Sequence, residues 1–320
     1  MTSQLVQQRL QGKLGPDVRI DREIPAGGVA HVYVATDATT GRKVVVKVLD
    51  PELAQAVDVE RFRREIQVCG RLQHPRIVPV IEACQSGNLL YYTMPLVRGK
   101  TLREVFHAGG ALPLADAVGY IEDIGSAIAF AHARNIIHRD IKPENIFIDD
   151  GRALLTDFCI ARAIEHAADI ASVTSTGLTV GTPRYMSPEQ AAAERHIDAR
   201  SDIYSLACVF YEMLAGEPPF EGSTPRILLA RHMHQDPPCV RIVRKDVPEH
   251  VEAAILKAMQ KSPAARFATV EEFVAALRAG PLDVPRPRSS TRARRSIAIG
   301  AALAAAVAVA GMLLARMLGG

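Results

Sequence analysis

Cysteines are few in this sequence, and their distribution limits what they can do. Only five of the 320 residues are cysteine. Their number is odd, their spacings are wide, and no Cys-x-x-Cys pair occurs, so a disulfide framework or a zinc site is improbable and a reducing cytosol fits. The N-terminal residues 1–17 have no apolar run, so we expect no signal peptide there.

Excess charge is also scarce outside the last forty residues. The whole chain has a net charge of +3, and residues 281–320 alone carry +5 because six arginines there face only Asp283. Residues 1–280 therefore carry −2. A nearly neutral main part argues against a nucleic-acid partner and places the basic excess in a tail.

Hydrophobic periodicity divides residues 18–280 into two parts. Residues 18–49 and 76–96 alternate as strands do, with a turn at Thr40 and Gly41, and a helix is expected over 57–72. After Gly99 the pattern is mainly helical, over 101–107, 113–134, 201–215, 224–235, 249–260 and 269–279, with short strands near 145–148 and 153–155. This predicts an α+β fold with a β-rich N-lobe, 18–96, and an α-rich C-lobe, 97–280.

One polar run between a helix and a short strand concentrates chemistry-bearing residues. It reads His138-Arg139-Asp140-Ile141-Lys142-Pro143-Glu144-Asn145, and Asp157-Phe158-Cys159 follows twelve residues later. Upstream, Lys47 ends the strand run Val44-Val45-Val46, and Glu65 lies on the expected helix. Together, in this order, the motifs resemble those of the protein kinase family, specifically the eukaryotic-like (Hanks-type) bacterial serine/threonine kinases. The resemblance covers about residues 18–280 and implies a bilobal kinase fold.

The resemblance implies a role for each polar residue in transferring the γ-phosphate of ATP to Ser or Thr hydroxyls of proteins. Lys47 would hold the α- and β-phosphates and be held by Glu65, while Asn145 and Asp157 would bind Mg²⁺, with Mn²⁺ as an alternative. A second set would act at the acceptor: Asp140 takes the hydroxyl proton, Lys142 neutralises the γ-phosphate, and Thr182 bridges those two. Alone, each residue has a plainer interpretation, as an exposed face residue, a helix-surface pair or a turn former.

Nucleotide-binding positions follow from the same resemblance. The adenine site would comprise Ile24, Val32 and Val45 above the ring, Phe147 below it, Met94 as gatekeeper, and the hinge from Pro95 to Val97. The glycine-rich loop is reduced to Gly27 and Gly28, and Pro25 removes one amide donor and fixes φ. We therefore expect a stiffer loop and weaker nucleotide binding.

Several other positions would be structural. Glu189, in Ser187-Pro188-Glu189, should pair with Arg266, and Asp202 should bind the backbone at His138 and Arg139, with His138 itself a packing residue. Cys159 replaces the glycine that the family has after Asp157-Phe158, and its Cβ narrows the backbone choices there. Pro25 and Cys159 favour the alternative interpretation, a membrane-tethered pseudokinase that binds partners without catalysis.

The segment between Asp157 and Glu189 contains candidate regulatory sites. By resemblance to related bacterial kinases, Thr174 and Thr176 would be autophosphorylated, because a phosphate there could bind the guanidinium of Arg139. The plainer interpretation is an ordinary polar loop.

The C-terminal forty residues change character twice. Residues 281–296 are rich in Pro, Arg and Ser, which is typical of a linker, and 297–315 are apolar and without charge. About 19 apolar residues suffice to cross a bilayer, so we expect one transmembrane helix there, with 316–320 as a short non-cytoplasmic tail. The arginines before it predict a cytoplasmic kinase domain on the cell membrane. Small residues at Gly300, Ala304 and Ala308 could pack a second copy into a homodimer.

Overall fold

The computed structural model describes residues 3–12, 14, 18–24, 30–50, 54, 59–86, 89–158 and 183–279. Residues Met1–Val284 form one compact unit and Pro285–Gly320 another. The second unit, with the linker and the proposed membrane span 297–315, lies outside the described residues. Of the helices that are described, none combines the length and the apolar character needed to cross a membrane.

The first part of the chain forms an antiparallel sheet of five strands with the order β1-β2-β3-β5-β4. The strands are β1 (Val18–Ile24), β2 (Ala30–Asp37), β3 (Lys43–Leu49), β4 (Glu82–Ser86) and β5 (Leu89–Pro95). The predicted turn joins β2 to β3, and Gly41 adopts φ +67° there, a conformation that favours glycine. The predicted strand runs are thus confirmed.

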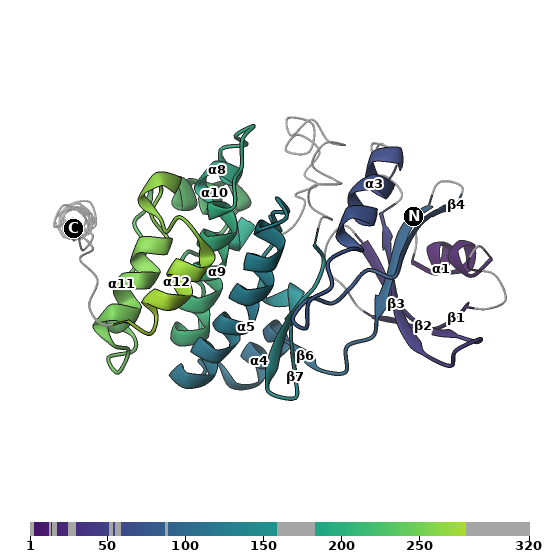
Figure 1. Cartoon of the computed structure of the whole chain (residues 1–320), viewed down its shortest axis with the longest axis horizontal. Coiled ribbons are helices and arrows are strands. Elements are labelled where there is room, and N and C mark those ends of the chain that lie inside the picture. The colour runs from purple at the N-terminus through teal and green to yellow at the C-terminus, as the bar shows by residue number, and fades with distance from the viewer. Residues whose placement is uncertain are drawn as a thin grey trace, which may run out of the picture. The chain divides into compact units, whose positions relative to one another are not determined.

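Both faces of this sheet are covered by helices (Figure 1). Helix α3 (Val59–Cys69) packs Phe62 and Ile66 against one face, together with Leu90 and Tyr92. Helix α1 (Ser3–Gln11) buries Val6 and Leu10 on the other, in a cluster with Tyr33, Ala35, Val46, Val48, Leu89 and Tyr91. The sequence-based expectation for residues 1–17 is only that they hold no signal peptide, so helix α1 and its packing on the sheet were not predicted.

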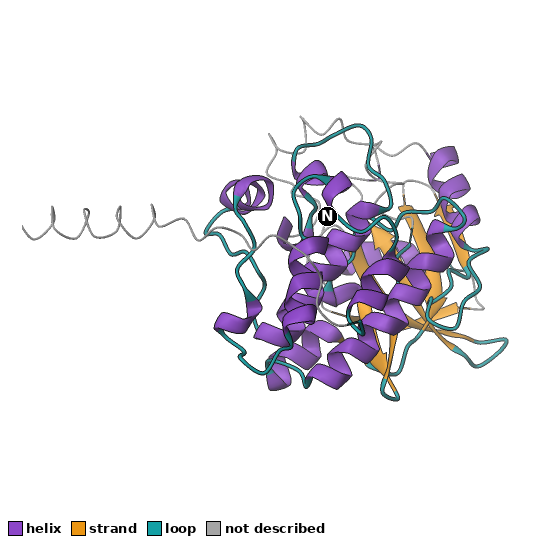
Figure 2. Cartoon of the chain, turned by 60° about the vertical axis from the view of Figure 1, so that its left-hand side comes forward, coloured by secondary structure: helices purple, strands orange, loops and turns teal. Residues whose placement is uncertain are grey.

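The second part of the chain is mainly helical, as predicted, and Figure 2 shows its helices as a group beside and partly in front of the orange strands. Its elements in chain order are β6 (Lys100–Thr101), α4 (Leu102–Gly109), α5 (Leu114–His132), η1 (Pro143–Asn145), β7 (Ile146–Asp149), β8 (Arg152–Leu155), η2 (Pro183–Tyr185), α8 (Pro188–Ala191), α9 (Arg200–Ala215), α10 (Pro225–His234), η3 (Val240–Ile242), α11 (Glu249–Ala258), η4 (Pro263–Ala265) and α12 (Val270–Ala276). Strands β6, β7 and β8 form a small antiparallel sheet beside α5. Every residue of α9 from Ser201 to Leu214 is buried, so this helix is the centre of the C-lobe core.

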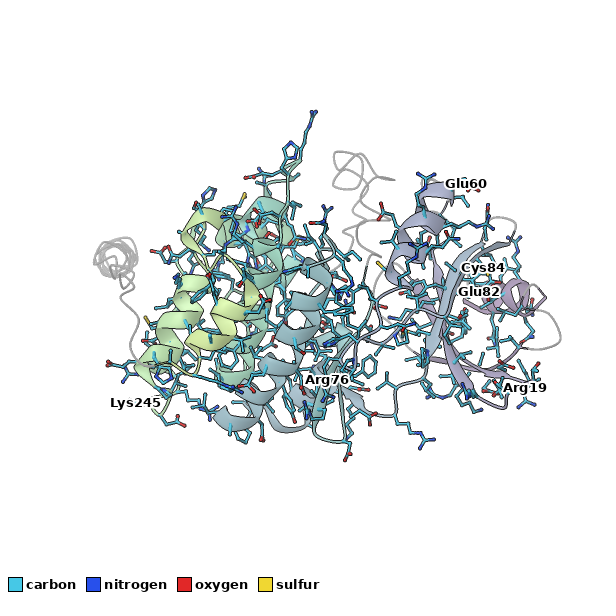
Figure 3. All side chains as sticks on the ribbon, viewed as in Figure 1. Arg19, Glu60, Arg76, Glu82, Cys84 and Lys245 are labelled. Carbon is cyan, nitrogen blue, oxygen red and sulfur yellow. The ribbon has the colours of Figure 1, made fainter. Side chains whose placement is uncertain are left out.

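The loop after α3 ties the two lobes together. Arg76, which follows α3, places Nε 3.0 Å from Oδ1 of Asp123 on α5, and Figure 3 shows it beside that helix. Arg152 donates to the same carboxylate through Nε and Nη2 at 2.9 and 2.6 Å, and the amide of Ala153 adds a bond of 3.0 Å. One buried carboxylate thus joins the α3–β4 loop, α5 and β8.

The cysteines depart from the sequence-based expectation at one position. Cys69, at the end of α3, is disulfide-bonded, whereas Cys84, Cys208 and Cys239 have free thiols. Cys159, the fifth cysteine of the sequence, lies outside the described residues. The expectation argued against a disulfide framework, and one bonded cysteine among those described is less than a framework. It nevertheless shows that wide spacing in sequence does not exclude a disulfide in a folded domain.

Candidate active site

Lys47 and Asp157 meet at the boundary between the two lobes. Lys47 lies on β3, and its Nζ is 2.5 Å from Oδ2 of Asp157, which follows β8. The hydroxyl of Tyr92 donates to Oδ1 of the same carboxylate at 2.9 Å. Burial alone would raise the pKa of Asp157, but the ion pair with Lys47 and the bond from Tyr92 outweigh it and hold that pKa below its usual value. Asp157 is therefore an ionised, preoriented carboxylate.

The predicted partnership of Lys47 with Glu65 is not made in this structure. Among the described residues, the ion pair of Lys47 is with Oδ2 of Asp157. A lysine that engages a carboxylate would be free to exchange it once a phosphate enters. The pairing of Lys47 with Glu65 stays a prediction.

Asp140, Lys142 and Asn145 form a second polar group on the C-lobe. Lys142 Nζ donates to Oδ2 of Asp140 at 2.7 Å, and Asn145 Nδ2 donates to the carbonyl and to Oδ2 of Asp140 at 2.8 and 3.0 Å. Burial would lower the pKa of Lys142, but the charges of Asp140, Asp157 and Glu144 outweigh it and raise that pKa. Lys142 is consequently a permanent cation between Asp140 and Asp157.

Asp202 fixes the backbone that carries Asp140, as predicted. Its carboxylate accepts from the amides of His138 and Arg139, both at 2.8 Å, and lies 2.7 Å from Nε2 of His132. Arg139 has φ +68°, a strained value for a residue with a Cβ, so these bonds hold the loop in a conformation it would otherwise avoid. His138 is fully buried and packs edge-on against Phe158, with ring centroids 4.6 Å apart, which confirms its packing role.

The predicted pair of Glu189 and Arg266 is also present. Arg266 Nη1 and Nη2 each donate to one oxygen of Glu189 at 2.7 Å, in the bidentate geometry that a planar guanidinium favours. The remaining donors of Arg266 bind the carbonyls of Gln260, Lys261 and Arg200 at 2.8 to 3.0 Å. The pair anchors the short helix α8 to the end of the C-lobe.

Apolar side chains from both lobes gather where the adenine site is predicted. Val32, Val45 and Met94 form one buried cluster with Val78, and Ile24, Leu96, Val97 and Leu154 pack against it. Pro95 ends β5 beside them, whereas Phe147 on β7 is not a member of this cluster. The structure thus brings together most of the residues predicted to surround the ring.

The residues present fit a magnesium–nucleotide site. Asp157 offers a carboxylate, and Asn145 offers its amide oxygen because Nδ2 is engaged with Asp140. Within the part of the chain that the structure describes, no group of three or more His, Cys, Asp or Glu side chains could hold a metal on its own. A divalent cation held by Asp157 and Asn145 would take its other ligands from water and substrate phosphates.

Several predicted site residues lie outside the described residues, so the structure does not place them: Pro25, Gly27, Gly28, Cys159, Thr174, Thr176 and Thr182. Conversely, sequence reasoning missed Tyr92 and Arg103. Tyr92 is the cross-strand partner of Lys47, so the strand register was the available signal. Arg103, on α4, bonds Glu144, Tyr185 and Glu212, and nothing in the sequence indicates this because the three partners come from distant segments.

Comparisons with known proteins agree with this geometry. The family model described as the protein kinase domain matches residues 18–275. The serine/threonine-protein kinase PknB of Mycobacterium leprae is 42% identical over 257 residues, which is 78% of this chain and 41% of that protein. The serine/threonine-protein kinase PrkC of Bacillus subtilis is 38% identical over 273 residues, 85% of this chain and again 41% of the relative. The chain therefore spans about two fifths of the length of these curated relatives.

A solved structure gives the same answer for the fold. The crystal structure of Rad53 1–466 in complex with AMP-PNP superimposes with a TM-score of 0.67 at 26% identity, covering 86% of this chain and 69% of that one. Since the family model spans most of the chain, and the catalytic motifs meet in space, the chain belongs to the protein kinase family.

Proposed function

We propose that this chain is a serine/threonine protein kinase that transfers the γ-phosphate of ATP to Ser and Thr hydroxyls of proteins. The observation that carries the proposal is the pairing of Lys47 with Asp157 at 2.5 Å and of Asp140 with Lys142 and Asn145 at 2.7 and 3.0 Å. The charge of Asp157 helps to raise the pKa of Lys142, which links the two groups electrostatically. Relatives named as serine/threonine kinases and a neighbour crystallised with AMP-PNP support the substrate classes. Phosphoryl transfer needs mainly positioning and charge neutralisation, which is what this group supplies.

Each residue then has a defined task. Lys47 leaves Asp157 to bind the α- and β-phosphates, and Asp157 and Asn145 would hold Mg²⁺, or Mn²⁺. The side chain of Asp140 is 40% exposed, so an acceptor hydroxyl can reach it and donate its hydrogen bond there. Lys142, fixed on Asp140, neutralises the charge that develops on the transferred group, and Thr182 is proposed to bridge the two. Mg²⁺ would supply charge neutralisation between the phosphates.

Replacing one catalytic atom tests the activity. Asp140→Asn should reduce phosphorylation of a generic basic protein by about 10³-fold, because the variant cannot accept the hydroxyl proton. Asp116→Asn, an exposed substitution in the first turn of α5, serves as the matched control and should retain the wild-type rate. Equal signals from wild type and Asp140→Asn would instead support the pseudokinase scaffold.

We also propose that the kinase is anchored to the cell membrane through 297–315, with the kinase domain in the cytoplasm. The run has no charged residue and follows a linker with five arginines. The full chain should stay with membranes after alkaline carbonate extraction, whereas residues 1–284 should be released. Release of the full chain would contradict anchoring. Crosslinking of the full chain against a Gly300→Leu variant tests whether this segment also forms the homodimer.

Autophosphorylation of Thr174 and Thr176 completes the proposal. The guanidinium of Arg139, next to Asp140, is the group that a phosphate on this segment would neutralise. After incubation with magnesium and ATP, mass spectrometry should find phosphate on one or both threonines in wild type and on neither in Asp140→Asn. An active enzyme with both threonines unmodified would contradict this part of the proposal.

A further inference from the structure

Arg103, on α4, bridges two carboxylates that come from different parts of the C-lobe. Its Nε donates to Oε1 of Glu144 at 2.8 Å, and its Nη1 donates to Oε1 of Glu212, on α9, at 2.6 Å. Its Nη2 donates to the hydroxyl of Tyr185, and that hydroxyl donates to Oε2 of Glu212 at 2.5 Å. All three guanidinium nitrogens are thus engaged by one acidic group.

The partners of Arg103 differ sharply in exposure. Side-chain exposure is 3% for Glu212, 19% for Arg103 and 46% for Glu144. The two carboxylates share a single cation, so the group as a whole carries one negative charge. Without Arg103, both carboxylates would remain without this cation, Glu144 accessible to solvent and Glu212 buried.

This acidic group borders the catalytic residues. Glu144 lies two residues after Lys142 and one before Asn145, and its charge is among those that raise the pKa of Lys142. Tyr185 closes η2 and joins this group through its hydroxyl, which bonds to Glu212. A substrate chain that presents its hydroxyl to Asp140 must therefore pass close to Glu144 and Tyr185.

We propose that Arg103 is a specificity-determining residue that fills, from within the chain, a position where a basic substrate side chain would otherwise bind. The inference rests on the proposed kinase function. A substrate arginine would need the same charge-assisted bonds to Glu144 and Glu212 that Arg103 already makes, and it would also be repelled by Arg103. The wild-type enzyme consequently gains nothing from a basic residue near the acceptor, and removal of Arg103 opens an acidic subsite.

The test uses the full chain in mild detergent and one acceptor peptide scanned with arginine or alanine at each flanking position. For the wild-type enzyme, kcat/KM with arginine and kcat/KM with alanine should differ by no more than about two-fold at every position, because no new charge-assisted bond forms. Arg103→Leu should raise the arginine-to-alanine ratio of kcat/KM about ten-fold at one position, the value of one such bond gained. Adding Glu144→Gln to Arg103→Leu should remove the gain. Arg278→Leu, which breaks an exposed pair with Glu122, is the matched control.

The remaining outcomes are decisive as well. A strong wild-type preference for arginine that Arg103→Leu leaves unchanged would overturn the proposal, as would an active Arg103→Leu enzyme with a wild-type profile. If circular dichroism shows that Arg103→Leu does not fold, Arg103→Lys replaces it in the test. Lysine keeps the positive charge but lacks the planar, forked donors of arginine, so the arginine-to-alanine ratio of kcat/KM should rise about three-fold. Fluorescence anisotropy of the labelled arginine peptide measures the subsite without catalysis, so an inactive enzyme would count against the proposed function alone.

Discussion

The lobe that carries Lys47 and the lobe that carries Asp140 are built on cores of different size. Among the described residues, the N-lobe sheet buries its apolar side chains in three small clusters, one on the face that α1 covers and two on the opposite face. The C-lobe has one continuous cluster arranged around α9. Thin layers on both faces of a sheet deform more easily than a helix surrounded by packed neighbours.

The difference explains how the site is divided. Asp140, Lys142 and Asn145 bind one another on the rigid lobe, and Asp202, inside the core, holds their backbone. Lys47 and Tyr92 lie on the deformable lobe and, among the described residues, contact the site through Asp157. The residues that would act on the acceptor hydroxyl are thus already held in place, whereas the position of the nucleotide-binding Lys47 depends on the position of the N-lobe sheet relative to the C-lobe.

Breaking the anchor of α8 should give the largest loss of stability. Arg266 is fully buried and donates to Glu189 and to three carbonyls, so Arg266→Met leaves a buried carboxylate unpaired. We expect the free energy of unfolding to fall by about 4 kcal/mol in urea titrations. Replacing Glu189 by leucine as well should recover part of this loss. Arg278→Met, at an exposed pair, should cost less than about 1 kcal/mol, and equal losses at both sites would contradict the comparison.

Creating a cavity between α1 and the N-lobe sheet should lower the free energy of unfolding somewhat less than Arg266→Met does. Leu10 is fully buried between α1 and the sheet, so Leu10→Ala should destabilise the protein by about 3 kcal/mol through lost burial and a residual cavity. The matched control is Leu5→Ala on the same helix, where the side chain is 40% exposed. Hydrogen exchange should increase in β1, β2 and β3 and not in α9. A loss of protection that spreads equally over both lobes would show that they are not separate in stability.

The sequence alone predicted more of the C-lobe than of the N-lobe. Strand alternation and helical periodicity predicted the short strands and the helices of the C-lobe. The order of the catalytic motifs, through their resemblance to protein kinases, predicted the bonds of Asp202 and the pair of Glu189 with Arg266, because fixed motifs specify these contacts. The docking of α1 was not predicted, since it depends on the outer face of a sheet assembled from distant strands. The run from Val44 to Val48 was the available sign, because strands covered on both faces read as continuous apolar runs.

The actual partner of Lys47 could not be read from the sequence for a different reason. Motif order places both Glu65 and Asp157 near this lysine, and the choice between them depends on the position of α3 and on what occupies the site. The network of Arg103 was hidden in another way, because Glu144, Tyr185 and Glu212 come from three segments that meet only in the folded C-lobe.

Low pH should destabilise the C-lobe core in particular, because a buried histidine lies there. His232 on α10 is fully buried, its Nδ1 is 3.0 Å from the hydroxyl of Tyr204, and burial together with the charge of Lys261 lowers its pKa to about 3. Between about pH 6.5 and pH 3 the unfolded chain binds a proton there that the folded chain does not, so stability falls as pH falls.

The expected size is about 2 kcal/mol between pH 6.5 and pH 5, from a limiting slope of about 1.4 kcal/mol per pH unit. His232→Gln keeps an acceptor for Tyr204 and cannot be protonated, so this part of the pH dependence should disappear in urea titrations across that range. His234→Gln, exposed on the same helix, should leave it intact. An unchanged slope in His232→Gln would show that another group causes the acid sensitivity.

The smallest effect is expected where the lobes meet. Tyr92 is 3% exposed, and its hydroxyl orients the carboxylate of Asp157 without occupying every lone pair of Oδ1. Tyr92→Phe keeps the packing but removes that bond, so Asp157 should bind Mg²⁺ less well, with the half-saturating concentration raised about ten-fold. Tyr91→Phe, on the opposite face of the same strand, is the matched control. A hydroxyl that merely stabilised the fold would lower the unfolding free energy and leave the magnesium dependence unchanged, so the two titrations together separate positioning from packing.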